Sequence, residues 1–253
     1  MNTLLIIGAT SGMASECAKI WINDKKNKYE KVILVARNKE KLSVIGRNLR
    51  ARSANLVEIV EKTAEFSDLA SIKQVCDEIR SEAGEISTVL IAHGVLCDNR
   101  VCLNDCNEIA KGFMVNGTSV AVFLESVVAI MKDHNIEGHI GVIGSVAGDR
   151  GRASNYVYGA GKSLVETYVQ GVQHALALAK SKIRVTLVKP GPTRTPMTAN
   201  LDNSKFAPVG LVANDIVRAV NKGKREIYTP GKWRLIMFVI RNMPSSIFNL
   251  INI

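Results

Sequence analysis

Three residues of this sequence have the types and spacing needed to move a proton to or from a carbonyl oxygen. Tyr158 and Lys162 are four residues apart, so on a helix the phenol and the ammonium lie on one face, one turn apart. A neighbouring cation lowers the pKa of a phenol from about 10 towards neutrality, which prepares it for acid–base work. Ser145, upstream of both, can hydrogen-bond the same oxygen while its charge changes. This chemistry interconverts an alcohol and a carbonyl, provided that a hydride carrier binds nearby.

A glycine-rich turn near the amino terminus predicts where that carrier binds. The apolar run 4–7 is typical of a buried parallel strand, and Gly8-Ala9-Thr10-Ser11-Gly12-Met13 follows it directly. Glycines let the backbone approach a diphosphate, and the N-terminus of the next helix stabilises that charge with free N–H groups. Such a turn is a weak signal alone. Its place after the first strand, in a chain that carries Tyr158 and Lys162, makes it a strong one.

These residues, in this order and spacing, resemble the short-chain dehydrogenase/reductase superfamily over essentially the whole chain. The resemblance is carried by Gly8-x-x-x-Gly12-x-Ala14, Asp68-Leu69, Asn116, Ser145, Tyr158-x-x-x-Lys162 and Pro190-Gly191. Two departures stand out, because Ala14 replaces the usual third glycine and Ala92-His93-Gly94 stands where Asn-Ala-Gly is usual. Neither departure removes a catalytic group. The second changes the support of the central strand and lets His93 add a polar contact near the cofactor.

The resemblance implies a role for each matching residue. Tyr158 is expected to be the general acid/base, Ser145 to orient the carbonyl, and Lys162 to hold the nicotinamide ribose as well. Asn116 is expected to support a proton relay to solvent, with a buried structural asparagine as the alternative. The cofactor is expected to contact Gly8, Thr10, Ser11, Gly12, Met13, Arg37, Asp68, Leu69, Ala92, His93, Gly94, Tyr158, Lys162, Pro190, Gly191 and Thr193.

Arg37, just past the second predicted strand, distinguishes between the two nicotinamide cofactors. An NAD site normally places a carboxylate there to bind the adenosine ribose hydroxyls. Arg37 instead offers a planar, positively charged fork that matches a 2′-phosphate, and Ser11 can add a hydroxyl. A solvated arginine at the end of a strand is the alternative. We therefore expect NADP(H) rather than NAD(H), and reduction as the physiological direction.

Strand-like and helix-like segments alternate along the chain. The predicted strands are 4–7, 32–36, 57–61, 89–92, 140–143, 184–188 and 226–228, and helices are expected between them, as at 69–82 and 107–133. This pattern is typical of a doubly wound α/β domain of the Rossmann type, a parallel sheet of about seven strands with helices on both faces. The 253 residues fit a single domain, in which 192–215 is expected to close over the substrate as a lid.

The composition narrows the classes of function. A net charge of +10 invites a nucleic-acid hypothesis, but the basic residues are spread along the chain without a recognition motif or stacking platform. We expect no nucleic-acid partner. The run Gly159-Ala160-Gly161-Lys162-Ser163 resembles the end of a P-loop but lacks a preceding strand, which argues against kinases and ATPases.

Cysteine usage and the amino terminus predict the compartment. Five cysteines without a C-x-x-C motif indicate a reducing cytoplasm, and no signal peptide is visible. Cys97, Cys102 and Cys106 cluster near His93, but their spacing lacks the tight pairs of zinc sites. We expect free thiols and no metal.

The C-terminal segment 232–253 combines apolar and basic residues. Lys232-Trp233-Arg234 precedes the apolar run 235–240, and Arg241 follows it. The run is too short to span a bilayer, but its flanks suit a helix at a membrane interface. Docking on the chain's own core or on a dimer partner is the alternative. With the Ala-His-Gly variant, this tail also resembles that of reductases acting on polyprenylphosphoryl keto-pentoses.

The sequence thus predicts an NADP(H)-dependent oxidoreductase that interconverts a carbonyl and a secondary alcohol, with a lipid-linked or sugar substrate. A reductase of a small soluble or acyl-linked ketone is the alternative, and a non-catalytic NADP(H) sensor is the third hypothesis. The apolar faces of 107–133 and 157–178 resemble the family's dimer-forming pair, which implies a homodimer or homotetramer. We expect a cytoplasmic protein, with peripheral binding to the inner face of a membrane as the variant that the tail suggests.

Overall fold

Seven parallel strands form one sheet in the computed structural model, which describes residues 2–24, 29–54 and 56–251. Their spatial order is β3-β2-β1-β4-β5-β6-β7, and every neighbouring pair is parallel. The strands are β1 (Asn2–Ile7), β2 (Lys31–Ala36), β3 (Glu58–Thr63), β4 (Glu85–Ile91), β5 (His139–Ile143), β6 (Arg184–Pro190) and β7 (Glu226–Thr229). The predicted doubly wound fold is confirmed. Its strand order reverses between β1 and β4, which is where such sheets bind ligands.

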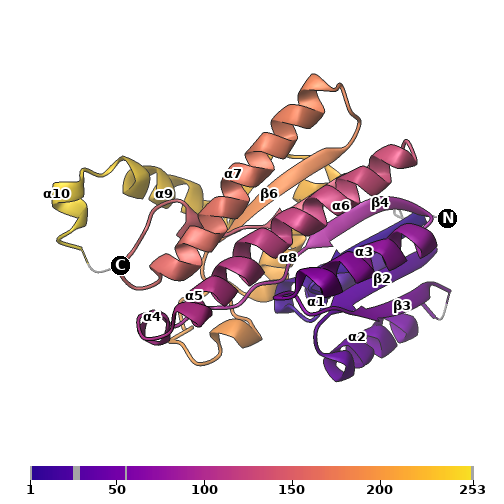
Figure 1. The fold of residues 1–253 in the computed structure, drawn as a ribbon, viewed down its shortest axis with the longest axis horizontal. Helices are drawn as coiled ribbons and strands as arrows, with labels where there is room; N and C mark the ends of the chain where they lie inside the picture. Colours follow the sequence, from indigo (N-terminus) through magenta and orange to yellow (C-terminus); the bar gives the residue numbers. More distant parts are fainter. Residues whose placement is uncertain (1, 25–28, 55, 252–253) are drawn as a thin grey trace.

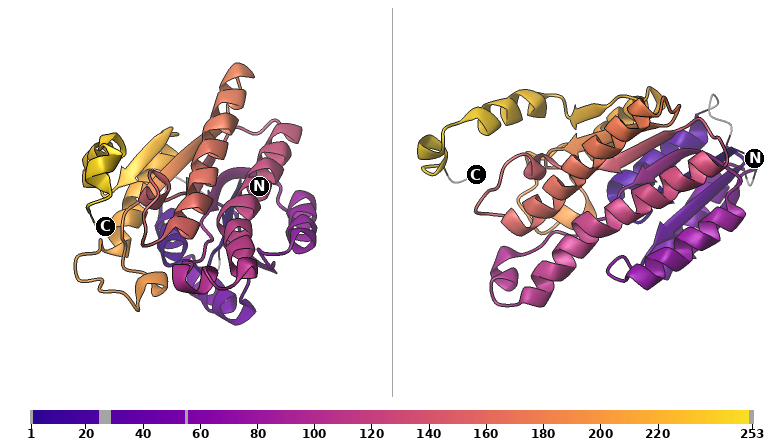
Figure 2. Two further views of the ribbon diagram at one scale, coloured as in Figure 1. Left: turned by 60° about the vertical axis from the view of Figure 1, so that its left-hand side comes forward. Right: turned by 45° about the horizontal axis from the view of Figure 1, so that its top comes forward.

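Helices cover both faces of the sheet (Figures 1 and 2). On one face lie α1 (Gly12–Asn23), α2 (Lys39–Arg52) and α8 (Val209–Asn221). On the other lie α3 (Leu69–Glu82), α6 (Ser119–Asp133) and α7 (Tyr156–Leu178). Successive side chains of a strand point to opposite faces, so Leu4 packs in one core layer and Leu5 in the other. Both layers need apolar side chains, which is why the central strands are rich in apolar residues, whereas the edge strands β3 and β7 are more polar.

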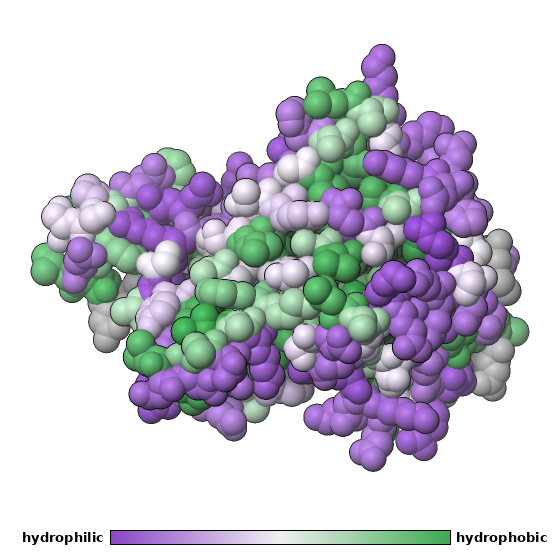
Figure 3. Space-filling view, in the orientation of Figure 1, coloured by the Kyte–Doolittle hydropathy of each residue, from purple (hydrophilic) through white to green (hydrophobic). Residues whose placement is uncertain are grey.

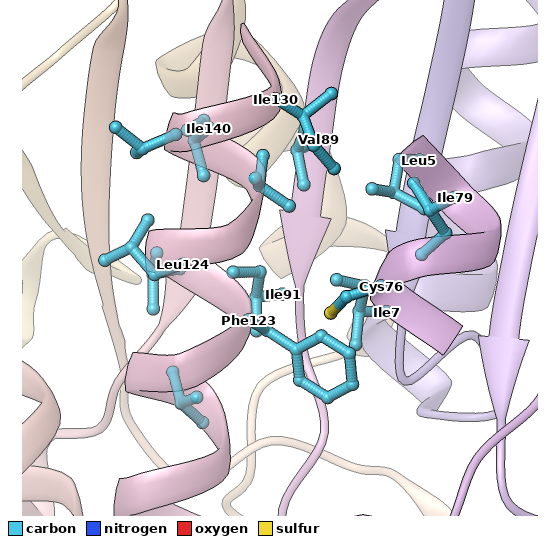
Figure 4. Close-up of a cluster of buried hydrophobic side chains, with 14 of the residues drawn as sticks. Leu5, Ile7, Cys76, Ile79, Val89, Ile91, Phe123, Leu124, Ile130 and Ile140 are labelled. Carbon is cyan, nitrogen blue, oxygen red and sulfur yellow. The ribbon is translucent and has the colours of Figure 1, made fainter. Parts of the chain in front are cut away.

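The core layer beneath α3 and α6 is closely packed. Figure 4 shows side chains of β1 and β4 meeting those of α3 and α6: Leu5, Ile7, Val89, Ile91, Cys76, Ile79, Phe123 and Leu124. Burying one such aliphatic or aromatic side chain stabilises the fold by about 1.5–3 kcal/mol. These contacts fix the carboxyl ends of β1 and β4, where the predicted site residues follow.

The predicted helix over 107–133 is found as one continuous helical stretch, Cys106–Asp133. Within it, α5 (Cys106–Phe113) and α6 are joined by a π-helical turn over Met114–Thr118, and a short helix, α4 (Asn99–Cys102), precedes them. The π turn was not expected; Asn116 lies in it and bonds a neighbouring loop. By length and composition the stretch 106–133 could cross a bilayer. Its α6 part is instead a core helix, with Phe123 and Leu124 fully buried.

The predicted lid, 192–215, lies after β6. Residues 192–208 hold little regular structure beyond a 3₁₀ turn at Pro196–Thr198. From Val209 the chain is helix α8, whose Val212 and Ala213 are fully buried. The part 209–215 begins a helix whose apolar side chains pack in the core, and closure of 192–215 over the substrate stays a prediction.

The chain continues past β7 as an arm formed by α9 (Lys232–Asn242) and α10 (Ser245–Phe248). The arm projects from the body on the side where the strands end, at the left of Figure 1. Arg150 holds it by donating to the carbonyl oxygens of Ile240 (2.5 Å) and Met243 (2.6 Å). Its guanidinium also lies 3.8 Å from the ring centroid of Phe248.

Candidate active site

The carboxyl ends of several strands converge on one cavity of about 190 Å³. It is lined by residues from the turn after β1 and from the ends of β4, β5 and β6, together with α7 and the segment after β6. The predicted site residues on its wall are Ser11, Met13, Ala92, His93, Gly94, Ser145, Tyr158, Lys162, Pro190, Gly191 and Thr193. The predicted site residues outside its lining are Gly8, Thr10, Gly12, Arg37, Asp68, Leu69 and Asn116. The structure thus brings Ser145, Tyr158 and Lys162 together with the residues predicted for the nicotinamide end of the cofactor, while Asn116 lies outside the cavity lining.

Ser145, Tyr158 and Lys162 come from two neighbouring elements. Ser145 follows β5 and caps a 3₁₀ turn, where its Oγ accepts a hydrogen bond from the Ala147 N–H (3.1 Å). Tyr158 lies in the first turn of α7 and is hydrogen-bonded to Ser145. Lys162 lies one turn further on, with its Nζ 5.9 Å from the centroid of the Tyr158 ring. The predicted arrangement of serine, phenol and ammonium around one point is present.

Burial shifts the pKa values of Tyr158 and Lys162. It raises the pKa of Tyr158 above its usual value near 10, although the bond to Ser145 opposes this. Burial also lowers the pKa of Lys162 to about 8. The Lys162 Nζ donates to the Ile143 carbonyl oxygen (3.0 Å), and the expected lowering of the Tyr158 pKa by Lys162 stays a prediction. A protonated phenol is the form that can donate a proton to a carbonyl.

Asn116 is positioned by the π turn and clamps the loop after β4. Its amide accepts from the Val95 N–H and donates to the Val95 carbonyl oxygen, each at 2.9 Å. A side chain at Gly94 would lie 2.9 Å from the Asn116 Oδ1 and 3.5 Å from the Lys162 Nζ. Gly94 therefore lets the asparagine and the lysine approach the end of β4 from either side. Asn116 is fully buried, so its structural role is observed and its relay role stays a prediction.

His93 is neutral and held against aromatic rings. The Ser119 hydroxyl donates to the Val115 carbonyl oxygen (2.9 Å), so it accepts from the His93 Nε2–H (2.8 Å). The imidazole packs 4.4 Å from the ring centroid of Phe66. Burial lowers its pKa to about 3. Its Nδ1 has no hydrogen-bond partner among the described residues and is the ring atom left for the expected polar contact.

The turn after β1 has the form that a diphosphate requires. Gly8 has a φ of +84°, and a Cβ there would lie 2.5 Å from the His93 backbone nitrogen. Ser11 begins α1, and its side chain makes no capping bond within the described chain. The first N–H groups of α1 and the Ser11 hydroxyl can therefore face a phosphate. This cradle fits a nicotinamide dinucleotide.

The predicted adenosine end lies beyond the cavity. Arg37 is exposed at the end of β2. The Asp68 carboxylate caps α3 by accepting from the Ala70 (3.0 Å) and Ser71 (3.3 Å) N–H groups. Leu69 is 53% exposed, as a residue covering a flat ring would need to be. Their contacts with a cofactor stay predictions.

Several lining residues were not anticipated from the sequence. Arg152 and Asn155, from the loop before α7, and Thr195 and Thr198 reach the cavity wall. Trp233, the second residue of α9, packs its indole directly on Gly191 and leaves no room for a side chain there. The only feature of the sequence that could have indicated Arg152 as a lining residue is the basic run from Arg150 to Arg152, a few residues before Tyr158.

The three cysteines near this site do not form a metal centre. Cys97 accepts a long hydrogen bond from the Asn116 Nδ2 (3.6 Å), Cys102 is buried and Cys106 is exposed. In the described ranges, no group of three or more His, Cys, Asp or Glu side chains could hold a metal ion.

A buried charge cluster lies directly below the Pro190-Gly191 turn. Lys189 is fully buried and forms ion pairs with Asp149 and with Glu166 (2.5 Å). Its Nζ also donates to the Tyr228 hydroxyl (3.1 Å), which in turn donates to Asp149 (3.0 Å). The cluster ties β6 and β7 to α7 and to the loop after Ser145, so it fixes two walls of the cavity.

We expect Lys189→Met to lower the free energy of unfolding by about 3–5 kcal/mol, because it leaves buried carboxylates without a partner. Urea unfolding followed by circular dichroism measures this. Lys182→Met is the matched control, since the Lys182–Glu137 pair is exposed and such a pair contributes at most about 1 kcal/mol. Equal losses in the two variants would contradict the role given to Lys189.

Comparisons with known proteins agree on one family. A family model described as short chain dehydrogenase matches residues 2–205. An uncharacterised oxidoreductase of Mycobacterium tuberculosis is 29% identical over 217 residues, which cover 84% of each chain. A short-chain dehydrogenase from Sphingobium yanoikuyae, solved in complex with NADPH, has a TM-score of 0.80 at 22% identity and covers 97% of this chain and 98% of its own. A short-chain dehydrogenase/reductase from Burkholderia phymatum, solved in complex with NAD, has a TM-score of 0.79 at 20% identity, covering 94% and 92%.

Proposed function

Because this chain belongs to the short-chain dehydrogenase family, we propose that it is an NADP(H)-dependent reductase that converts a carbonyl into a secondary alcohol. The observation that carries the proposal is the shared cavity of Ser145, Tyr158 and Lys162 beside the Pro190-Gly191 turn. A non-catalytic sensor would need no such proton donor.

The chain's own residues account for the proton side of the reaction. The cofactor, when bound, supplies the hydride. Ser145 and Tyr158 hydrogen-bond the carbonyl oxygen, and the protonated Tyr158 hydroxyl donates its proton as negative charge develops there. Lys162 keeps its charge below about pH 8 and stabilises the phenolate that remains. Asn116, fixed on the Val95 peptide, supports a proton relay between this group and solvent.

Arg37 is the feature that supports NADPH as the cofactor. Arg37 is exposed at the predicted adenosine end and forms no ion pair among the described residues, although the Glu65 carboxylate lies within electrostatic reach of it. Its planar fork suits a 2′-phosphate. The structural neighbours include both an NADPH and an NAD complex, so the preference rests on Arg37.

A substrate screen that follows NADPH oxidation tests the proposal. It should include simple diketones, acyl-linked ketones, keto sugars and prenyl-phosphate-linked keto sugars. Turnover of any of these supports a reductase. Tight NADPH binding without turnover of any of these ketones would favour the sensor.

We further propose that the arm formed by α9 and α10 lies on an anionic membrane surface. Of the residues described in these helices, Met237 alone is buried, while Leu235 is 70% and Phe238 65% exposed. Figure 3 shows apolar side chains beside polar ones on this arm. Lys232, Arg234 and Arg241 supply the positive charge that such a surface attracts. A lipid-linked substrate would then meet the enzyme at the bilayer.

Replacing Leu235, Phe238 and Val239 with serine should lower partition onto vesicles of phosphatidylglycerol and phosphatidylcholine at least about tenfold, because each contributes apolar burial. Co-sedimentation measures it. The matched control replaces Leu56, Leu103 and Leu178, which are 85%, 70% and 73% exposed elsewhere. If the two triple variants bind the vesicles equally well, the proposal that the arm lies on a membrane is wrong.

We also infer that the chain forms an oligomer, in which the exposed face of α5 and α7 packs against a second copy of the chain. A broad apolar area covers these helices in Figure 3. Phe113 is 37% and Leu164 40% exposed there, although both lie beside the packed core. A homodimer or homotetramer formed through this face would cover them, and light scattering measures the mass.

A further inference from the structure

The loop before α7 brings a guanidinium into the cavity. Arg152 and Asn155 form a tight turn, in which the Asn155 N–H donates to the Arg152 carbonyl oxygen (3.1 Å). Both side chains line the cavity together with Ser145 and Tyr158. The positive charge of Arg152 acts on the Tyr158 hydroxyl, so it lies close to the reacting centre.

The charge of Arg152 is not balanced by the protein. Its Nε is buried and has no hydrogen-bond partner among the described residues, and no ion pair is formed by its guanidinium within them. The nearest carboxylate that acts on it is Asp149. That carboxylate is already paired with Lys189 and bonded by Tyr228.

Asn155 adds a second unsatisfied polar group beside it. Its Oδ1 is buried without a partner in the described part of the chain, and its side chain makes no capping bond to α7. An unpaired guanidinium in a partly buried place costs free energy unless an anion completes it. The Asn155 Oδ1 is an acceptor, so it suits a hydroxyl of the substrate beside the anion and not the anion itself.

We propose that Arg152 binds an anionic group, a phosphate or a carboxylate, that the substrate carries near its reacting carbonyl. The planar fork of arginine suits both groups. This inference rests on the proposed reductase function and names the class of substrate.

The residues around Arg152 also indicate how a substrate that carries this anion would lie. Arg152 lines a second cavity of about 440 Å³, under the arm, with Tyr156, Phe248 and Ile251. An anion bound by Arg152 therefore lies between the reacting centre and the apolar end of the arm. In a soluble substrate, the phosphate or carboxylate bound by Arg152 would be the end of the molecule. In a lipid-linked substrate, the bound group would be a phosphodiester, and its lipid chain would extend along the arm.

The test compares ketones that differ only in the anion. The pairs are dihydroxyacetone with its phosphate, and methyl acetoacetate with acetoacetate. We expect the wild type to have a kcat/KM at least about tenfold higher for the anionic member of one pair, and Arg152→Met to bring that ratio close to one. The ratio is the readout because Arg152 also acts on Tyr158. Arg218→Met, an exposed arginine of α8, is the control for loss of one positive charge.

Two further arms separate the outcomes. A prenyl phosphodiester of a keto-pentose, compared with the soluble keto-pentose phosphate, distinguishes a lipid source from a soluble one. Calorimetry with inorganic phosphate on the NADP⁺-bound protein needs no turnover, and we expect Arg152→Met to weaken binding at least about tenfold. Arg152→Lys should retain part of the affinity. Equal ratios and equal phosphate binding in wild type and Arg152→Met would overturn the inference, whereas failure of the wild type to reduce any ketone would overturn the reductase itself.

Discussion

Tyr158→Phe should lose at least about a thousandfold in kcat while NADPH still binds, because the variant lacks the proton donor and little else. The ring keeps its place in the first turn of α7, and Lys162 keeps its bond to the Ile143 carbonyl oxygen. Fluorescence titration measures NADPH binding, and stopped-flow absorbance measures hydride transfer.

Tyr156→Phe is the matched control for this experiment. Tyr156 lies on the same helix two residues earlier, is 42% exposed and lies outside the lining of the active-site cavity, although it lines the second cavity beside Arg152. With a small ketone that does not reach this second cavity, its variant should keep the wild-type rate within a factor of about two. Comparable rates for Tyr158→Phe and the wild type would end the assignment of Tyr158 as the acid.

Arg37→Asp should reverse much of the preference for NADPH over NADH. Removing a charge-assisted contact to the 2′-phosphate costs about 1.5–3 kcal/mol, or about ten- to a hundredfold in relative affinity. The new carboxylate also repels the 2′-phosphate and can bind the ribose hydroxyls of NADH. The measurement is kcat/KM for each cofactor at one ionic strength, because the contact is screened by salt.

The control for Arg37 is Arg47→Asp, which places the same charge change on the exposed surface of α2. We expect that variant to leave the cofactor ratio unchanged. If Arg37→Asp also leaves it unchanged, Arg37 is a solvated residue at the end of a strand and the choice of cofactor has another origin.

The sheet could be predicted because most of its strands can be recognised in the sequence from their own residues. The central strands are largely apolar runs such as 4–7 or 140–143, since both of their faces are buried, and the residues with chemistry come directly after such runs. Once the sheet is parallel, the ends of β1, β4, β5 and β6 must share one edge. The meeting of Ser145 with Pro190 and Gly191 follows from that geometry.

What the sequence left open depends on contacts between distant segments. The π turn at Asn116 is set by hydrogen bonds to Val95, and the pKa of Tyr158 by burial that no spacing reveals. The sequence places Lys189 next to a predicted strand but does not show that it forms ion pairs with Asp149 and Glu166, which come from two other parts of the chain. The role of Arg152 could not be predicted, because it depends on Asp149 being paired with Lys189 and therefore not with Arg152.

A crystal structure of the protein with NADP⁺ is the most direct examination of these assignments. We predict the nicotinamide ring against the Pro190-Gly191 turn, with its ribose hydroxyls on Lys162 and its reactive face open to the Tyr158 hydroxyl. A nicotinamide bound elsewhere, or Ser145 and Tyr158 directed away from it, would contradict the account.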